Sequence, residues 1–225
     1  MRGTFFLFVL VVALQSDAQQ LQLPFSVKYF SGSIRSTDSL LIKNVGKKNG
    51  LGLPNYEITI LDTAALIRPY ERERERAESM IGSGFRSHTI FVDLKNQYQY
   101  FQSEPIGLDK FLVQEKYRQT VYDLINDSIS VLGYTCYKAV LKAKPGNQTN
   151  SVMWYAPSLP YPISHLGFSG LPGLVLASET YNGKSRAVLI ATEIKTEKRT
   201  IVKPFKGKPV TQETFFKALE TLRRN

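Results

Sequence analysis

Residues 174–194 read LVLASETYNGKSRAVLIATEI, and this stretch predicts a β-hairpin. Two runs rich in apolar and β-branched residues, 174–181 and 186–194, flank the pair Asn182-Gly183. Asn-Gly is a favoured pair for a two-residue type I′ loop, because both positions need a positive φ. Both faces of the hairpin become apolar away from the turn, so we expect it to lie deep inside a sheet.

The predicted loop also predicts a register for the two strands. It pairs Tyr181 with Lys184 and, two residues further along each strand, Glu179 with Arg186. The pairs beyond these are apolar and consist of Ala177–Val188, Leu176–Leu189 and Val175–Ile190. An opposite-charge pair near the turn and apolar pairs further in each stabilise a hairpin by roughly 0.2–1 kcal/mol.

Elsewhere the chain repeatedly alternates apolar and polar residues with a period of two, which is typical of strands. Besides the hairpin, the candidate strands are residues 24–31, 39–45, 56–61, 89–94, 98–103, 111–114, 120–125, 134–142 and 151–156. Short strands at close spacing with turn residues between them indicate a meandering antiparallel sheet.

The C-terminal segment 211–223 is predicted to be helical. Thr211 follows Pro209 and can cap the first turn. The apolar residues of the segment recur at helical spacing and share one face; they are Phe215, Phe216, Leu219 and Leu222. The predicted fold class is therefore mainly β (α+β), with one C-terminal helix.

Residues 1–18 have the three-part layout of a cleavable secretory signal peptide. Arg2 precedes ten apolar residues at 5–14 (FFLFVLVVAL), and Ser16-Asp17-Ala18 places small residues at −3 and −1 of a cut before Gln19. A membrane-spanning helix would need about 20 apolar residues. We therefore expect a periplasmic or secreted protein with no transmembrane segment, in which residues 19–225 form a single mostly β domain.

The chain carries 29 Lys and Arg against 19 Asp and Glu, a formal net charge of +10. This balance favours anionic partners, and basic residues are enriched at 43–48 and at 195–208. Neither cluster has the aromatic or Gly pattern of a nucleic-acid module, so no nucleic acid partner is expected. The alternating run Glu71–Arg76 neutralises itself and predicts a solvated element, with a role in partner binding as the alternative.

The residues that could support catalysis are few. His88 and His165 are far apart and lack the spacing of a zinc site, and no phosphate-binding Gly loop is present, so neither a metal nor a cofactor is predicted. Ser164 and Ser169 flank His165, which leaves a Ser–His hydrolase open as a second alternative, although no nucleophile elbow surrounds either serine. Cys136 is the only cysteine, and its apolar surroundings predict a buried, inert thiol.

The most distinctive constellation runs from Trp154 to Glu179. A strand ends at Trp154-Tyr155-Ala156-Pro157, and after a Pro-rich loop the chain re-enters the sheet through Phe168-Ser169-Gly170-Leu171-Pro172-Gly173-Leu174. Pro and Gly at these positions predict a rigid corner that sets the register of the following hairpin. The alternative is that the same residues line the rim of a ligand pocket; the candidates for either role are Trp154, Tyr155, Pro157, Phe168, Gly170, Leu171, Pro172, Gly173 and Leu174.

The stretch 170–175, GLPGLV, resembles the name-giving motif of the GLPGLI family, exported proteins of Bacteroidota, with Val in place of the final Ile. The segment 129–139, ISVLGYTCYKA, is similar to another segment of that family, and so is the Trp-Tyr-x-Pro strand at 154–157. The similarity covers about residues 28–193. The family has no assigned activity, so the resemblance implies a compartment and a source but no reaction.

A strongly curved antiparallel sheet with a helix against it satisfies these constraints and is similar to the half-barrel of periplasmic lipoprotein carriers. Such a sheet can enclose an apolar cavity. The first hypothesis is therefore a non-enzymatic envelope protein that binds or carries a lipid or another apolar or amphipathic ligand. An envelope interaction or scaffold protein that uses its basic surface to bind a protein partner is the alternative.

Overall fold

The computed structural model describes residues 23–34, 56–69, 89–103, 110–117, 120–141, 150–182, 185–196 and 198–224. The predicted signal peptide, the candidate strand 39–45, the charge run Glu71–Arg76 and His88 lie outside these residues.

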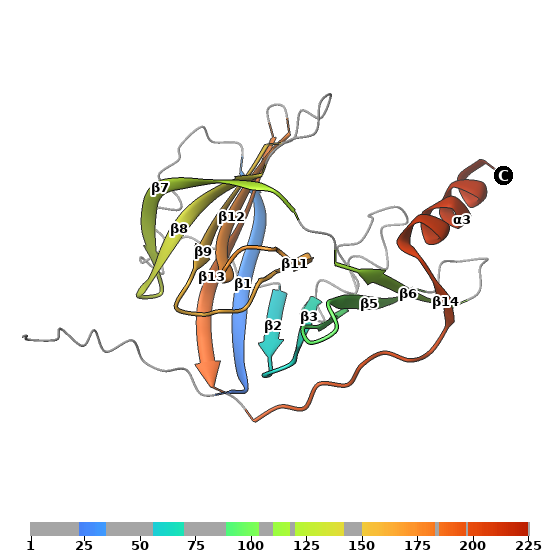
Figure 1. Ribbon diagram of the computed structural model, residues 1–225. Helices are drawn as coiled ribbons and strands as arrows, with labels where there is room; N and C mark the ends of the chain where they lie inside the picture. The colour runs from blue at the N-terminus through green and yellow to red at the C-terminus, as the bar shows by residue number, and fades with distance from the viewer. Residues whose placement is uncertain are drawn as a thin grey trace, which may run out of the picture.

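One 12-stranded sheet contains nearly all the strands, in the order β14-β6-β5-β4-β3-β2-β1-β13-β12-β9-β8-β7. The strands are β1 (Phe25–Ile34), β2 (Tyr56–Ile60), β3 (Ala64–Pro69), β4 (Ile90–Asp93), β5 (Tyr98–Ser103), β6 (Phe111–Lys116), β7 (Tyr122–Val131), β8 (Tyr134–Leu141), β9 (Asn150–Ala156), β12 (Leu174–Asn182), β13 (Ser185–Thr196) and β14 (Lys208–Val210). All neighbours pair antiparallel except β14 and β6, which are parallel. The sheet is strongly curved but does not close (Figure 1), which confirms the predicted fold class.

The core lies on the concave face of this sheet. On β1, alternate residues Phe25, Val27 and Tyr29 point into it, and their exposed fractions are 1%, 0% and 0%. The Tyr29 hydroxyl donates a hydrogen bond of 3.0 Å to the carbonyl oxygen of Val175, which satisfies its polar end inside the core.

A short hairpin covers part of the concave face. Residues 157–173, called the internal hairpin here, contain β10 (Ile163–Ser164) and β11 (Gly167–Phe168), which pair only with each other. Leu159 and Ile163 of this hairpin are buried in the same core as β1 and β2. Figure 1 shows the hairpin in front of the middle of the sheet.

After β13 the chain turns back across the outer face of the sheet. Residues 198–207, called the strap here, run below β2 and β3 in Figure 1 and lead into β14 at the sheet edge. Ile201 packs on the outer-face cluster of Phe91, Tyr100 and Leu112. The helix α3 (Gln212–Arg224) follows β14 and places Phe215 in the concave core. The C-terminal segment therefore wraps around one edge of the sheet and contacts both faces.

The helix confirms the predicted cap and corrects the predicted apolar face. The Thr214 amide donates to the Thr211 hydroxyl oxygen at 3.2 Å. Phe215 is buried, with its ring packed edge-on against Phe101 and Phe111. Phe216 is 37% exposed, whereas Leu219 packs against the concave core as predicted; the side chain of Leu222 lies outside the described residues.

The hairpin of β12 and β13 exists as predicted, but the predicted register is wrong. Asn182 pairs with Ser185, so residues 183 and 184 connect the strands, and Glu179 lies opposite Val188. A loop that begins with Gly is also common in two-residue hairpins, so the sequence allowed both choices. The shift is two residues, which keeps every side chain on its predicted face. Glu179 and Arg186 therefore still form an ion pair, now along the diagonal, and both are buried.

Four strands were not predicted. β3 follows β2 after a connection of only three residues, and its continuous apolar run lacks the alternation that marked the other strands. β10, β11 and β14 have only two or three residues each, too few to show a period. β7 also extends to Val131, beyond the predicted end at 125, across an irregularity between Ile125 and Ser128.

Candidate functional site

The candidate residues of the Trp154–Leu174 corner are divided between the two faces of the sheet. Trp154 and Leu174 belong to the concave core. Tyr155 and Leu171 belong to a separate cluster with Met153 on the opposite face. The corner therefore packs against the ends of β9 and β12 on both faces of the sheet.

Two glycines of the corner allow close contacts. Gly170 has a φ of 77°, and a Cβ there would overlap the Tyr117 hydroxyl. A Cβ on Gly173 would lie 2.6 Å from the Ala156 carbonyl carbon, where the strands before and after the loop meet. Phe168 packs on the Tyr117 ring with 4.9 Å between centroids. Pro157 and Pro172 are exposed at the surface of the corner.

The serines near His165 hydrogen-bond to the backbone of the internal hairpin. The Ser164 hydroxyl donates to the Gly167 carbonyl oxygen at 3.4 Å and accepts from the Leu166 amide at 3.2 Å. The Ser169 hydroxyl oxygen accepts from the Leu171 amide at 3.3 Å. The His165 ring is edge-on to Tyr56, with centroids 6.3 Å apart. These contacts give both serines a local structural role.

The Cys136 thiol is fully buried in the concave core, as predicted. Burial raises its pKa to about 12, because the thiolate would lose its hydration there. The described residues contain no cluster of three or more His, Cys, Asp or Glu side chains that could hold a metal ion.

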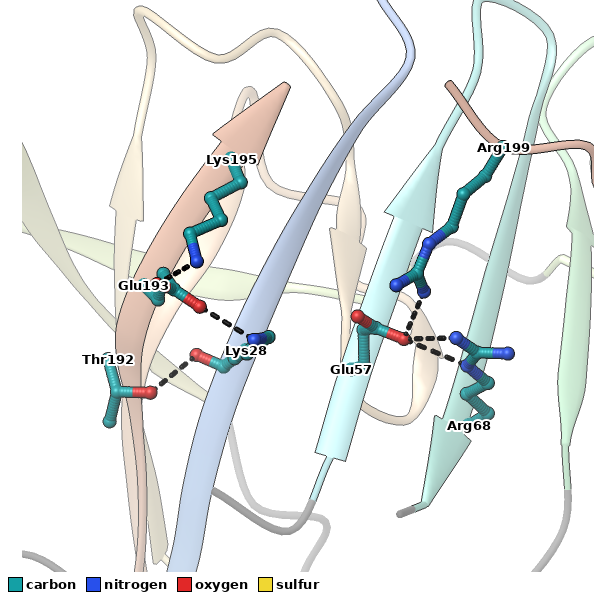
Figure 2. A network of polar contacts seen from close by, with 7 residues as sticks. All are labelled: Lys28, Glu57, Arg68, Thr192, Glu193, Lys195 and Arg199. Atoms are coloured by element: carbon teal, nitrogen blue, oxygen red, sulfur yellow. Dashed lines mark hydrogen bonds and ion pairs between the residues drawn. The ribbon is translucent and has the colours of Figure 1, made fainter. Parts of the chain in front are cut away.

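A row of alternating charges crosses four neighbouring strands on the outer face (Figure 2). From β3 to β13 it consists of Arg68, Glu57, Lys28 and Glu193, each directly opposite the next in the sheet register. The Arg68 Nε donates to Glu57 at 2.8 Å, and the Lys28 Nζ lies 2.7 Å from Glu193. Opposite charges placed directly across neighbouring strands stabilise the pairing.

Hydrogen bonds from Lys195 and Lys28 lower the pKa of Glu193 below its usual range. Glu57 is the most buried member of the row, with 3% of its side chain exposed. A second cation reaches it from outside the row, since the Arg199 guanidinium donates to the same Glu57 oxygen at 2.7 Å. Figure 2 shows Arg199 reaching Glu57 from the strap.

Three further contacts hold the strap and the start of β14 against the sheet. The Lys203 Nζ lies 3.8 Å from the centre of the Tyr100 ring. Gln102 on β5 donates to the Lys206 carbonyl oxygen, and the Lys208 amide donates to the Lys110 carbonyl oxygen at 2.7 Å. Lys203 also acts on Asp93 beneath it: burial alone would raise the pKa of Asp93, but hydrogen bonds from Asn96 and the charge of Lys203 lower it.

The outward face of the strap combines cations with exposed apolar side chains. Phe205 is 73% exposed and Val202 is 70% exposed. The segment 198–211 contains four Lys and one Arg and no acidic residue. Sequence reasoning identified the basic enrichment at 195–208 but missed Val202 and Phe205. Their alternation with lysines in VKPFKGK was the available signal, although exposure could not be read from it.

No helix among the described residues is long and apolar enough to cross a membrane. No family model matches the chain, and no curated protein does either. Two solved structures of PNGF-II, in space groups P21 and C2, are similar to it with a TM-score of 0.58 each. Their sequence identities to this chain are 17% and 14%. Each match covers 87% of this chain and 33% or 32% of the PNGF-II chain. The chain thus spans about a third of these neighbours, and the likeness concerns the fold.

Proposed function

We propose that this chain is an exported, non-enzymatic interaction protein that binds an anionic surface through its strap. The observation that carries the proposal is the outward face of the strap and the start of β14, where exposed Lys198, Lys206 and Lys208 lie in a segment, 198–211, without any carboxylate. Cations gathered on one segment attract polyanions more strongly than the same charges dispersed over the surface. Export rests on the signal-peptide pattern of residues 1–18, and membership of the GLPGLI family rests on residues 170–175.

The strap is ordered before any partner arrives. Arg199 binds Glu57, Gln102 binds the Lys206 backbone, and Lys208 binds the Lys110 backbone. A segment that is already ordered loses less conformational entropy on binding.

The concave face of the sheet is largely filled by the chain's own side chains, which favours the outer surface as the binding site. Leu159 and Ile163 of the internal hairpin are 3% and 0% exposed in the concave core, and Phe215 of α3 is 3% exposed there. The chain's own side chains thus fill much of the face that a carrier would use for its ligand. For this reason we place the interaction hypothesis before the carrier hypothesis.

Retention of residues 19–225 on an immobilised polyanion, such as heparin, tests the proposal. The variant K198A/K206A/K208A removes three exposed charges and leaves Lys203 on Tyr100 and Arg199 on Glu57. The control K116A/K138A/K217A removes the same charge from β6, β8 and α3. We expect the strap variant to elute at clearly lower salt than the control, because fewer counterions are released on binding. Equal elution of the two variants would show that the strap is not the binding surface.

A further inference from the structure

We infer that the anionic surface bound by the strap is a lipid bilayer, with Phe205 and Val202 inserted among the headgroups and the exposed Lys198, Lys206 and Lys208 on lipid phosphates. This inference rests on the proposed function and names its partner. Cations alone do not distinguish a bilayer from an acidic glycan or a protein. A bilayer differs from both because it offers an apolar layer directly beneath the anionic groups.

The exposure of the apolar side chains supports this partner. Of the large hydrophobic side chains that the structure describes, Phe205 and Val202 are the most exposed. Their neighbour Ile201 packs inward on the outer-face cluster, so the strap buries one apolar side chain and presents two to solvent. Exposed apolar side chains that lie together mark an interaction surface.

Pro204 and Gly207 restrict the backbone around Val202 and Phe205. Pro204 lies between them and fixes its own φ. Gly207 packs directly on the backbone of β6: a Cβ at this position would lie 2.6 Å from the Phe111 carbonyl carbon and 2.8 Å from the Leu112 nitrogen. Lys203 and Lys206 flank Phe205 in sequence, and the Lys206 Nζ lies 5.9 Å from its ring centre. Lys203 stays on the Tyr100 ring, whereas Lys206, beside an inserted Phe205 ring, can extend its ammonium group to the phosphate level.

A second exposed apolar patch does not fit an anionic membrane. On and next to the edge strand β7, Val121, Leu124 and Ile125 are 59%, 61% and 42% exposed. This strand carries Asp123 and Asp127 but no Lys or Arg, and the nearby Lys138 pairs with Asp127 at 3.3 Å, so the patch offers no excess of positive charge to anionic headgroups. The charge of the surrounding residues therefore selects the strap.

Co-sedimentation with lipid vesicles tests the inference directly. Residues 19–225 are mixed with vesicles of phosphatidylcholine alone or with 30% phosphatidylglycerol. We expect binding to the anionic vesicles and little binding to the neutral ones. The variant V202S/F205S should weaken binding to anionic vesicles about tenfold. The variant K198A/K206A/K208A should weaken it by roughly fivefold per lysine, because each lysine near an anionic membrane contributes about that factor. V202S/F205S should be retained on heparin like the parent chain.

A fluorescent reporter tests insertion at the predicted residue. The chain has a single Trp, Trp154, which is 6% exposed, so the parent protein serves as the reference. In F205W, anionic vesicles should shift the added emission to the blue and protect it from acrylamide, while the emission of the parent stays unchanged.

The outcomes separate the inference from the proposed function. If V202S/F205S binds anionic vesicles as tightly as the parent, or if F205W gives no shift, the bilayer inference is overturned and the anionic-surface proposal stands. The bilayer inference is also overturned, and the anionic-surface proposal stands, if the strap lysines are needed for retention of the parent on heparin but the parent does not bind anionic vesicles. If neither polyanion nor vesicle binding depends on the strap lysines, the proposed function itself fails.

Discussion

The carboxylate of Glu57 on β2 accepts a hydrogen bond of 2.7 Å from the guanidinium of Arg199, which lies 142 residues later in the chain. Glu57 also accepts from Arg68 on the neighbouring strand, so two guanidinium groups share one nearly buried carboxylate. This contact joins the sheet to the strap, and it is the first of the interactions that hold the C-terminal segment on the outer face.

Replacing Arg199 by Met should destabilise the protein by about 1–2 kcal/mol, because a hydrogen bond to a charged, buried acceptor is lost while Arg68 still compensates the charge. Urea unfolding measures this change. Trypsin should also cleave the strap faster after Lys206, which is followed by Gly207, since one attachment of the strap is gone.

Lys195→Met is the matched control for this variant. Glu193, the partner of Lys195, keeps its bond to Lys28 and is one-third exposed, so we expect a change below about 0.5 kcal/mol. Equal stability and equal cleavage rates in the two variants would contradict a special role for the Arg199–Glu57 contact.

Phe215 should be the residue that anchors α3. Phe215→Ala should cost about 3–4 kcal/mol, because it leaves a cavity between α3 and the rings of Phe101 and Phe111. Phe216→Ala removes the same atoms from a side chain that is 37% exposed and should cost less than about 1.5 kcal/mol. Urea unfolding of both variants measures the difference, and similar values would mean that the helix does not use the face described.

Gly170 should resist substitution more strongly than Gly133, although both have a positive φ (77° and 84°). A Cβ on Gly133 meets no atom within 4 Å, so Gly133→Ala should cost only the backbone strain of about 1–2 kcal/mol. Gly170→Ala adds overlap with the Tyr117 hydroxyl and should cost about 1–3 kcal/mol more in thermal or urea unfolding.

The double variant G170A/Y117F identifies the cause of that extra cost. Removing the hydroxyl should recover part of the stability lost in G170A, although Y117F also loses the 3.3 Å hydrogen bond from the Thr120 amide. No recovery in the double variant would assign the cost to the backbone alone.

Cys136 should be unreactive in the native protein. Because burial raises its pKa to about 12, iodoacetamide at pH 8 should modify it only after unfolding in urea. Mass spectrometry of the alkylated chain counts the modified thiols, and rapid modification of the native protein would contradict the described burial.

The same shift makes stability depend on pH. In the unfolded chain the thiol loses its proton near pH 8.5, whereas in the folded protein it keeps the proton up to about pH 12. The unfolded state then binds fewer protons, so stability should fall by about 1.4 kcal/mol per pH unit above pH 8.5 from this group. Between pH 8.5 and 10, C136A should lack this part of the slope, which parallel urea titrations can measure.

Local patterns predicted most of the strands, because a half-buried strand requires alternation of apolar and polar residues. They also placed the cap at Thr211 and the burial of Cys136. Local patterns did not predict the correct register of the hairpin of β12 and β13. Asn182-Gly183 satisfied a local turn preference, but the observed register places Arg186 directly opposite Tyr181, with its guanidinium 5.5 Å from the centre of the Tyr181 ring. The two registers place every side chain on the same face of the sheet, so only the sum of the contacts between the strands distinguishes them.

The Trp154–Leu174 corner shows a second limit of local sequence patterns. Turn chemistry explained its Gly and Pro residues, but the sequence could not reveal that Tyr155 and Leu171 face away from Trp154 and Leu174. The strap lies in a segment, 195–208, for which the sequence predicted only a basic enrichment. The apolar side chains of a lysine-rich segment can be buried against the sheet or exposed to solvent, and the local sequence does not distinguish these two cases.

By itself the sequence determined a mainly β chain with a curved antiparallel sheet, a capped C-terminal helix and one buried thiol, because period, turn preference and capping act between near neighbours. The tertiary structure alone decided that the C-terminal segment crosses the outer face before its helix enters the core. That path depends on contacts such as Arg199 with Glu57 and Phe215 with Phe101, which join residues more than 100 positions apart. Such contacts bury a charged group or an aromatic ring only after the whole sheet has formed. The path that they set for the segment places Val202 and Phe205 on the outer surface, where both are exposed.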